Sequence, residues 1–139
     1  MKVSNAMPLT MNAKETHLLD RFIGTVEEEA GLYARMPALL AREKRAVADA
    51  DRTSLTRTLA EKETLIGLIQ GIEEKRVGMQ TALAGMLGLA REKLTLRGIA
   101  RQLPEPHASR MKAAGEKLAA LVRRSDEHTS ELQSRQSIS

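Results

Sequence analysis

The fold is decided by the stretch AVADADRTSL, residues 46–55, because one long apolar pattern stops there and another begins. Asp49, Asp51, Thr53 and Ser54 are short polar residues whose side chains bond to nearby backbone in turns and at helix starts. On both sides, apolar residues recur in steps of three and four, or in sums of these, as on one face of a helix. The upstream set is Leu19, Phe22, Val26, Tyr33, Met36, Leu40 and Val47, and the downstream set is Leu55, Leu59, Ile66, Ile69, Ile72, Met79, Leu83 and Leu87. We therefore predict that the chain reverses direction between two long helices.

The two helices are predicted over residues 12–48 and 54–87. At about 1.5 Å per residue each is roughly 50 Å long, so they can lie antiparallel along their whole length. Asn12 is a suitable N-cap for the first helix, and Glu15 places an acid in its first turn. Pro37 lies inside this helix and lacks a backbone donor, so a kink is expected between Tyr33 and Pro37.

The pattern changes after Lys93, where a shorter helix is predicted. Thr95 can cap it, and Pro104-Glu105-Pro106 stops it. Pro106 can occupy the first turn of a last helix. The apolar residues of the short helix are Leu94, Leu96, Ile99 and Leu103, and those of the last helix are Met111, Leu118, Leu121 and Val122.

The composition favours helices over strands. Trp is absent, Phe22 and Tyr33 are the only aromatic residues, and the 139-residue chain has seven Met. No useful stretch alternates with the period of two that a strand requires. We predict an all-α fold: a long antiparallel helical hairpin with one or two shorter C-terminal helices, packed as a bundle or coiled coil. Residues 12–124 form a single helical domain in this prediction, after a disordered leader over residues 1–11.

The residues that usually carry chemistry are sparse. The chain has no Cys, and His17, His107 and His128 lie far apart without the spacing of metal ligands. Two pairs of acids are each flanked by Lys or Arg, and they are expected to form exposed ion pairs. These pairs are Glu61 with Glu63 and Glu73 with Glu74. No nucleophile elbow or phosphate-binding loop is present. The sequence therefore predicts a non-enzyme without metal or cofactor.

No signal peptide or membrane span is recognisable in the sequence. Residues 1–12 contain one Lys and no apolar run, and no segment approaches the roughly 20 apolar residues that cross a bilayer. We predict a cytoplasmic protein that does not insert into a membrane.

Several ordered segments carry a resemblance to a known family. They are Glu27-Glu28-Glu29, Leu32-Tyr33, Ala50-Asp51, Leu59-Ala60-Glu61-Lys62-Glu63, Leu94-Thr95-Leu96-Arg97 and Leu103-Pro104-Glu105-Pro106. In this order they resemble the FlgN flagellar export chaperones, over about residues 14–124. The resemblance implies a cytoplasmic chaperone that binds the helical ends of hook-filament junction proteins, of the FlgK and FlgL type. It would keep them unassembled until the flagellar export apparatus secretes them.

The resemblance also implies a location for cargo binding, and it ends before the chain does. In the family the C-terminal helix grips the cargo, which here designates Met111, Leu118, Leu121 and Val122. After Arg124 the sequence SDEHTSELQS, residues 125–134, departs from the family and resembles the translation of a DNA-sequencing adapter. Residues 125–139 are therefore predicted to be a non-native tail, and their Ser- and Gln-rich composition predicts disorder.

Two other functions fit parts of the sequence. A coiled-coil scaffold would use the same apolar and charged pattern for permanent self-assembly, and the apolar faces would serve either a closed bundle or a homo-oligomer. A basic nucleic-acid-binding protein would use the net charge of +4 and the cluster Arg91, Lys93, Arg97 and Arg101. Acidic residues are interspersed elsewhere and stacking aromatics are lacking, so a nucleic acid is not the predicted partner.

Overall fold

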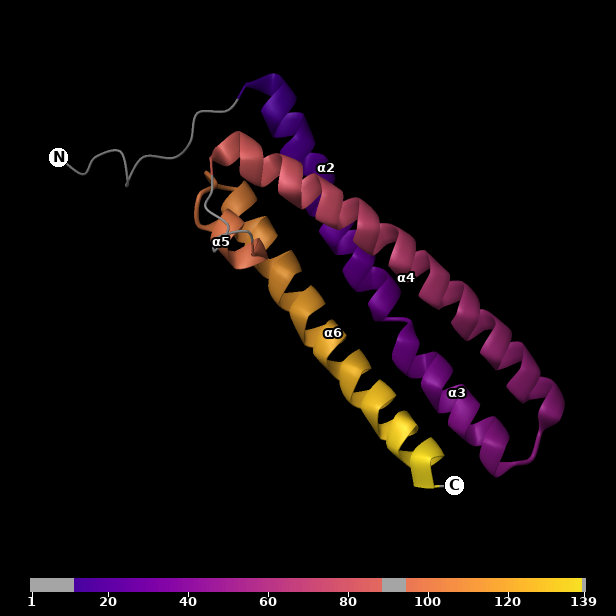
Figure 1. The fold of residues 1–139 in the computed structure, drawn as a ribbon. Helices are drawn as coiled ribbons and strands as arrows, with labels where there is room; N and C mark the ends of the chain where they lie inside the picture. Colours follow the sequence, from indigo (N-terminus) through magenta and orange to yellow (C-terminus); the bar gives the residue numbers. More distant parts are fainter. Residues whose placement is uncertain (1–11, 89–94, 139) are drawn as a thin grey trace.

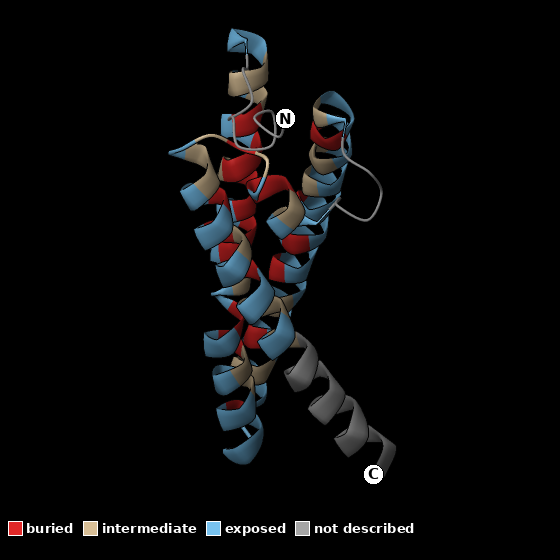
Figure 2. Ribbon diagram, turned by 90° about the vertical axis from the view of Figure 1, so that its left-hand side faces the viewer, coloured by how far each residue is buried: buried red, intermediate tan, exposed pale blue. Residues whose placement is uncertain are grey.

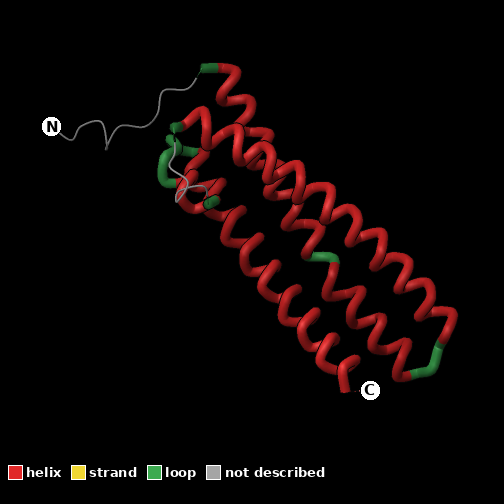
Figure 3. The backbone as a smooth tube through the Cα atoms, viewed as in Figure 1, coloured by secondary structure: helices red, strands yellow, loops and turns green. Residues whose placement is uncertain are grey.

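The computed structural model describes residues 12–88 and 95–138, and side chains as far as residue 125. This part of the chain is built from helices without any strand (Figures 1 and 3). In the labels of Figure 1 they are α2 (Ala13–Tyr33), α3 (Met36–Ala48), α4 (Arg52–Leu87), α5 (Leu96–Ala100) and α6 (His107–Ile138). The predicted all-α fold, with a long hairpin followed by C-terminal helices, is confirmed. The predicted leader, residues 1–11, lies outside the described residues, as do Arg91, Lys93 and Leu94.

Helix α2 begins where the sequence predicts. The Glu15 backbone N–H donates to Asn12 Oδ1 at 2.8 Å, and the Asn12 N–H donates to Glu15 Oε1 at 3.0 Å. This reciprocal pair is a capping box, which satisfies two backbone donors that the first turn leaves without helical partners.

The kink predicted near Pro37 is a break between two helices. Helix α2 ends at Tyr33, and α3 begins at Met36 with Pro37 in its first turn, where a missing N–H costs no helical hydrogen bond. Ala34 and Arg35 keep right-handed helical dihedral angles, so α3 continues close to the direction of α2 (Figure 1).

The reversal lies at the predicted hinge. Ala50 adopts a left-handed conformation with φ of 52°, and Asp51 caps α4 by accepting from the Ser54 N–H at 3.1 Å. Helix α4 starts at Arg52, two residues before the predicted Ser54, and ends at Leu87 as predicted. Ion pairs join the hairpin arms, with Arg42 2.6 Å from Glu61 and Lys62 2.9 Å from Glu43.

The core has two clusters of buried side chains. The larger lies among α2, α4, α5 and α6, and the smaller lies between α3 and α4. Figure 2 shows the buried segments densest in the upper half of the bundle, at the level of α5 in Figure 1. The larger cluster includes Leu19, Phe22, Ile23, Val26, Leu83, Ile99, Leu103, Met111 and Leu118, and the smaller contains Met36, Leu39, Leu65 and Ile69.

Helix α6 is longer than the sequence predicts. Its backbone is helical to Ile138 and so includes most of the segment 125–139, for which composition predicts disorder. An established helix extends at low cost because nucleation is already complete, and Glu127, Glu131 and Gln133 are good helix formers.

Candidate functional site

The candidate site is a groove beside α6, produced by the way three helices pack. Helices α4 and α6 both pack against α2, and they make little direct contact with each other. In Figure 1, α2 passes behind α4 and emerges on the side of α6. At one end, α5 fills the space with the buried side chain Ile99, followed by Leu103 just after the helix. A cavity of about 400 Å³ runs along α5 and α6. A second cavity adjoins it and reaches Arg76 of α4.

Small and apolar side chains form the floor of this groove, which we call the α6 groove. Its floor residues are Leu96, Gly115, Leu118, Ala119 and Val122. The four residues from α6 are spaced by three, one and three positions, so they share one side of the helix. Gly115 lets α5 lie close to α6, because a Cβ at this position would be 3.2 Å from the Leu96 Cβ.

The rim of the α6 groove is predominantly basic. Arg97, Lys112 and Arg123 are exposed there, with Glu116 as the one acidic residue that lines the two cavities. None of the three cations forms an ion pair with any residue that the structure describes. The rim therefore presents positive charge that an external partner can use.

Arg76 reaches from the groove into the core, where it meets a buried acid. Its Nε donates to Glu29 Oε1, and its Nη1 donates to Gln80 Oε1 at 2.8 Å. The side chain of Glu29 is 1% exposed, and its Oε2 has no hydrogen-bond partner among the described residues. Burial raises the pKa of Glu29, while the hydrogen bond and the charge of Arg76 oppose this rise. Arg76 thus links α4 to α2, and its charge is paired with that of Glu29.

The predicted cargo-binding residues divide between core and groove. Met111 and Leu118 are buried, at 0% and 4% exposed, and belong to the larger core cluster. Leu121 and Val122 are half-buried and pack against that cluster. Met111, Leu118 and Val122 line the α6 groove or its cavities, whereas Leu121 lines neither cavity.

Sequence reasoning missed three floor residues, Leu96, Gly115 and Ala119, as parts of this site. Leu96 was assigned only to the short helix, and its proximity to α6 depends on the loop that joins the two helices. Gly115 and Ala119 were missed because only large apolar residues were counted. Their spacing to Leu118 and Val122 was the available signal.

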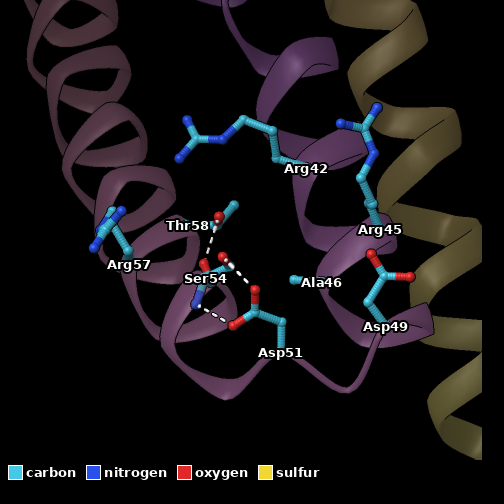
Figure 4. A pocket seen from close by; sticks show the side chains of 8 residues that line it. All are labelled: Arg42, Arg45, Ala46, Asp49, Asp51, Ser54, Arg57 and Thr58. Carbon is cyan, nitrogen blue, oxygen red and sulfur yellow. Dashed lines mark hydrogen bonds between the residues drawn. The ribbon is translucent and has the colours of Figure 1, made fainter.

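A second cleft, of about 190 Å³, lies at the hairpin turn between α3 and α4 (Figure 4). Asp51 caps α4 there, and the Thr58 hydroxyl donates to the Ser54 carbonyl oxygen at 2.7 Å. In Figure 4 the guanidinium groups of Arg42, Arg45 and Arg57 point in different directions. The cleft therefore does not bring its charged groups toward one bound atom, and we assign it a structural role.

Two titratable residues of α6 form contacts with α2. His107 Nε2 lies 2.7 Å from Asp20 Oδ1, and Arg110 donates to Glu27 Oε1 at 3.0 Å, which ties α6 to α2. Within the described residues, no group of three or more His, Cys, Asp or Glu is arranged to hold a metal ion. Among the described residues there is also no helix with the length and apolar character that crossing a membrane requires.

The comparisons with known proteins identify the family of this chain. The family model described as FlgN protein matches residues 11–136, which is most of the chain and extends into the segment after Arg124. No curated protein and no solved structure matches the chain. FlgN proteins are chaperones of flagellum biogenesis, a role consistent with a helical bundle that has an open groove. The chain therefore belongs to the FlgN family of flagellar export chaperones.

Proposed function

We propose that this chain binds, in the cytoplasm, the helical ends of flagellar hook-filament junction proteins of the FlgK and FlgL type. It keeps these ends unassembled until the flagellar export apparatus takes them. The observation that carries the proposal is the α6 groove, an open apolar floor between helices in a chain of a chaperone family. A partner helix inserted in such a groove is a common mode of peptide recognition.

The groove suits reversible binding. Its floor combines the small residues Gly115 and Ala119 with half-buried Leu96 and Val122, so it offers a shallow apolar surface. Half-buried Val122 can gain contacts from a partner without leaving the core that it already packs against. A partner can therefore bind and leave while the bundle stays folded.

The experiment is a calorimetric titration of the full chain with a purified junction subunit. The matched control is the same subunit without its terminal helical segments. We expect binding to the complete subunit and none to the truncated one. Equal binding to both forms would contradict recognition of the ends, and binding to neither would contradict the chaperone assignment for this class of cargo.

A coiled-coil scaffold remains the second candidate, because α4 has an exposed apolar side. Leu59, Ile66 and Val77 are exposed, and steps of seven and eleven residues place them on one side of the helix. A scaffold would associate permanently through this side. Light scattering distinguishes the two functions, since a scaffold retains its mass when a junction subunit is added, whereas a chaperone forms a complex with it.

A further inference from the structure

The bundle has one vacant helix position. Helices α4 and α6 are both packed on α2, and α5 with Leu103 covers the side between them at one end only. Along the rest of this side, the α6 groove is not covered by any described helix. In a four-helix bundle this is the position of the fourth helix, lying about 8–10 Å from its neighbours.

Resting on the proposed function, we infer that the partner segment occupies this position as a fourth helix, and that acidic residues flank its apolar face. From Gly115 to Val122 the groove floor covers about two helical turns, or roughly 10 Å. Ala119 is exposed and carries only a methyl group, so a partner helix can approach α6 there, beside the point where Leu96 of α5 covers Gly115. Partner side chains at positions i, i+3, i+4 and i+7 match this length.

The positive charge of the rim favours a partner helix with acidic residues beside its apolar face. Arg97, Lys112 and Arg123 have no ion-pair partner among the described residues, whereas the charge of Arg76 is directed at Glu29. Acidic flanks would form charge-assisted hydrogen bonds with these three cations, and basic flanks would be repelled. The rim therefore discriminates between helices that have the same apolar face.

A second copy of this chain is a less suitable occupant. The segment that it could offer is α4, where exposed Leu59, Ile66 and Val77 are accompanied by Glu63 and Glu73. Such a contact joins two different surfaces of the same chain, so it continues head to tail and produces rings or filaments. A chaperone that must present one cargo at a time is poorly served by that association.

The test compares two double substitutions that change charge equally on α6. Lys112→Glu/Arg123→Glu reverses two rim cations. Lys117→Glu/Arg124→Glu reverses two exposed cations that lie roughly 120° away around the helix and line neither cavity. Titration of both full-length variants with the purified junction subunit is expected to give about tenfold weaker binding for the rim pair and less than about threefold for the control pair. Circular dichroism checks that both variants keep their helical content.

Each other outcome overturns the inference in a recognisable way. An equal loss in both variants would mean that only overall charge matters. Unchanged binding by the rim variant, with normal binding by the unsubstituted chain, would refute the acidic fourth helix and leave the chaperone function intact. If the unsubstituted chain does not bind the junction subunit, the proposed function fails together with this inference. If light scattering shows an assembly that only the rim pair dissociates, the occupant is a second copy.

Discussion

The ion pair between Arg76 and Glu29 allows a quantitative prediction for Arg76→Leu. The substitution leaves a carboxylate that is 1% exposed without its cation, and no residue within the described part of the chain bonds to Glu29 Oε2. Removing one member of a buried ion pair costs about 3–5 kcal/mol. Because the Arg76 side chain is itself 17% exposed, water can reach part of the site, and we expect the lower end, about 3 kcal/mol at pH 7.

Two variants separate the buried charge from other effects. Lys75→Leu removes an exposed cation from the neighbouring position and is expected to change the free energy of unfolding by less than about 0.5 kcal/mol. The double substitution Glu29→Leu/Arg76→Leu removes both charges, so its stability is expected to return to within about 1 kcal/mol of the original. Urea denaturation followed by circular dichroism measures all three values.

The pH dependence of the stability loss provides an independent check on the role of the Glu29 charge. Burial raises the pKa of Glu29 above 4.5, so between 4.5 and the folded pKa the folded state binds more protons than the unfolded state. Its contribution to stability therefore falls as the pH rises through the folded pKa. Arg76→Leu removes the two contributions that lower this pKa, so the loss of stability caused by the substitution is larger at pH 7 than at about pH 5. A loss no greater than that of Lys75→Leu, or a double variant as unstable as Arg76→Leu, would refute the reasoning.

Four further predictions concern the groove and the helix ends. Leu118→Asp places a carboxylate in the core and is expected to lower the free energy of unfolding by at least about 3 kcal/mol, measured by urea denaturation. Val122→Asp is expected to keep the helical content by circular dichroism but to weaken binding of the junction subunit, and retained affinity would remove Val122 from the site. Gly71→Ala is expected to stabilise the chain by up to about 1 kcal/mol, because beyond its chain neighbours and the local helix backbone no described atom lies within 4 Å of the added Cβ. Gly115→Ala meets Leu96 and is expected to gain less or to destabilise. Ala50→Gly is expected to raise the melting temperature by relieving roughly 1 kcal/mol of left-handed strain, and a lower value would contradict this.

Apolar periodicity predicted the helices well but assigned their faces less accurately. It predicted the range 54–87 for the helix found at Arg52–Leu87, and polar hinge residues located the reversal. It also placed Leu59 and Ile66 with the core residues, although both are exposed, while Thr58 and Leu65 are buried. Neighbouring positions differ by about 100° around a helix, so a side chain one position from the core stripe still satisfies steps of three and four.

The site was predictable only in part, because it depends on contacts between distant segments. The resemblance pointed to the last helix, but Met111 and Leu118 proved to be core residues, which only the packing of α6 against α2 could reveal. The groove exists because α5 lies against Gly115, and the position of α5 is set by a loop rather than by periodicity. Glu29 lies three residues after Val26 and four before Tyr33, so its spacing on the apolar face was the signal that separated it from exposed Glu27 and Glu28.

The arrangement of contacts around α2 explains how the groove can accept a helix without loss of the fold. Helix α4 is attached to α2 through Arg76 and Glu29, and α6 is attached to α2 through His107 and Asp20. Helices α4 and α6 make little direct backbone contact, but Leu83 of α4 shares the larger core cluster with Met111 and Leu118 of α6. A fourth helix of the kind inferred above would therefore have to bind on the surface of α5 and α6 without separating this core, and the bundle would stay held together by α2.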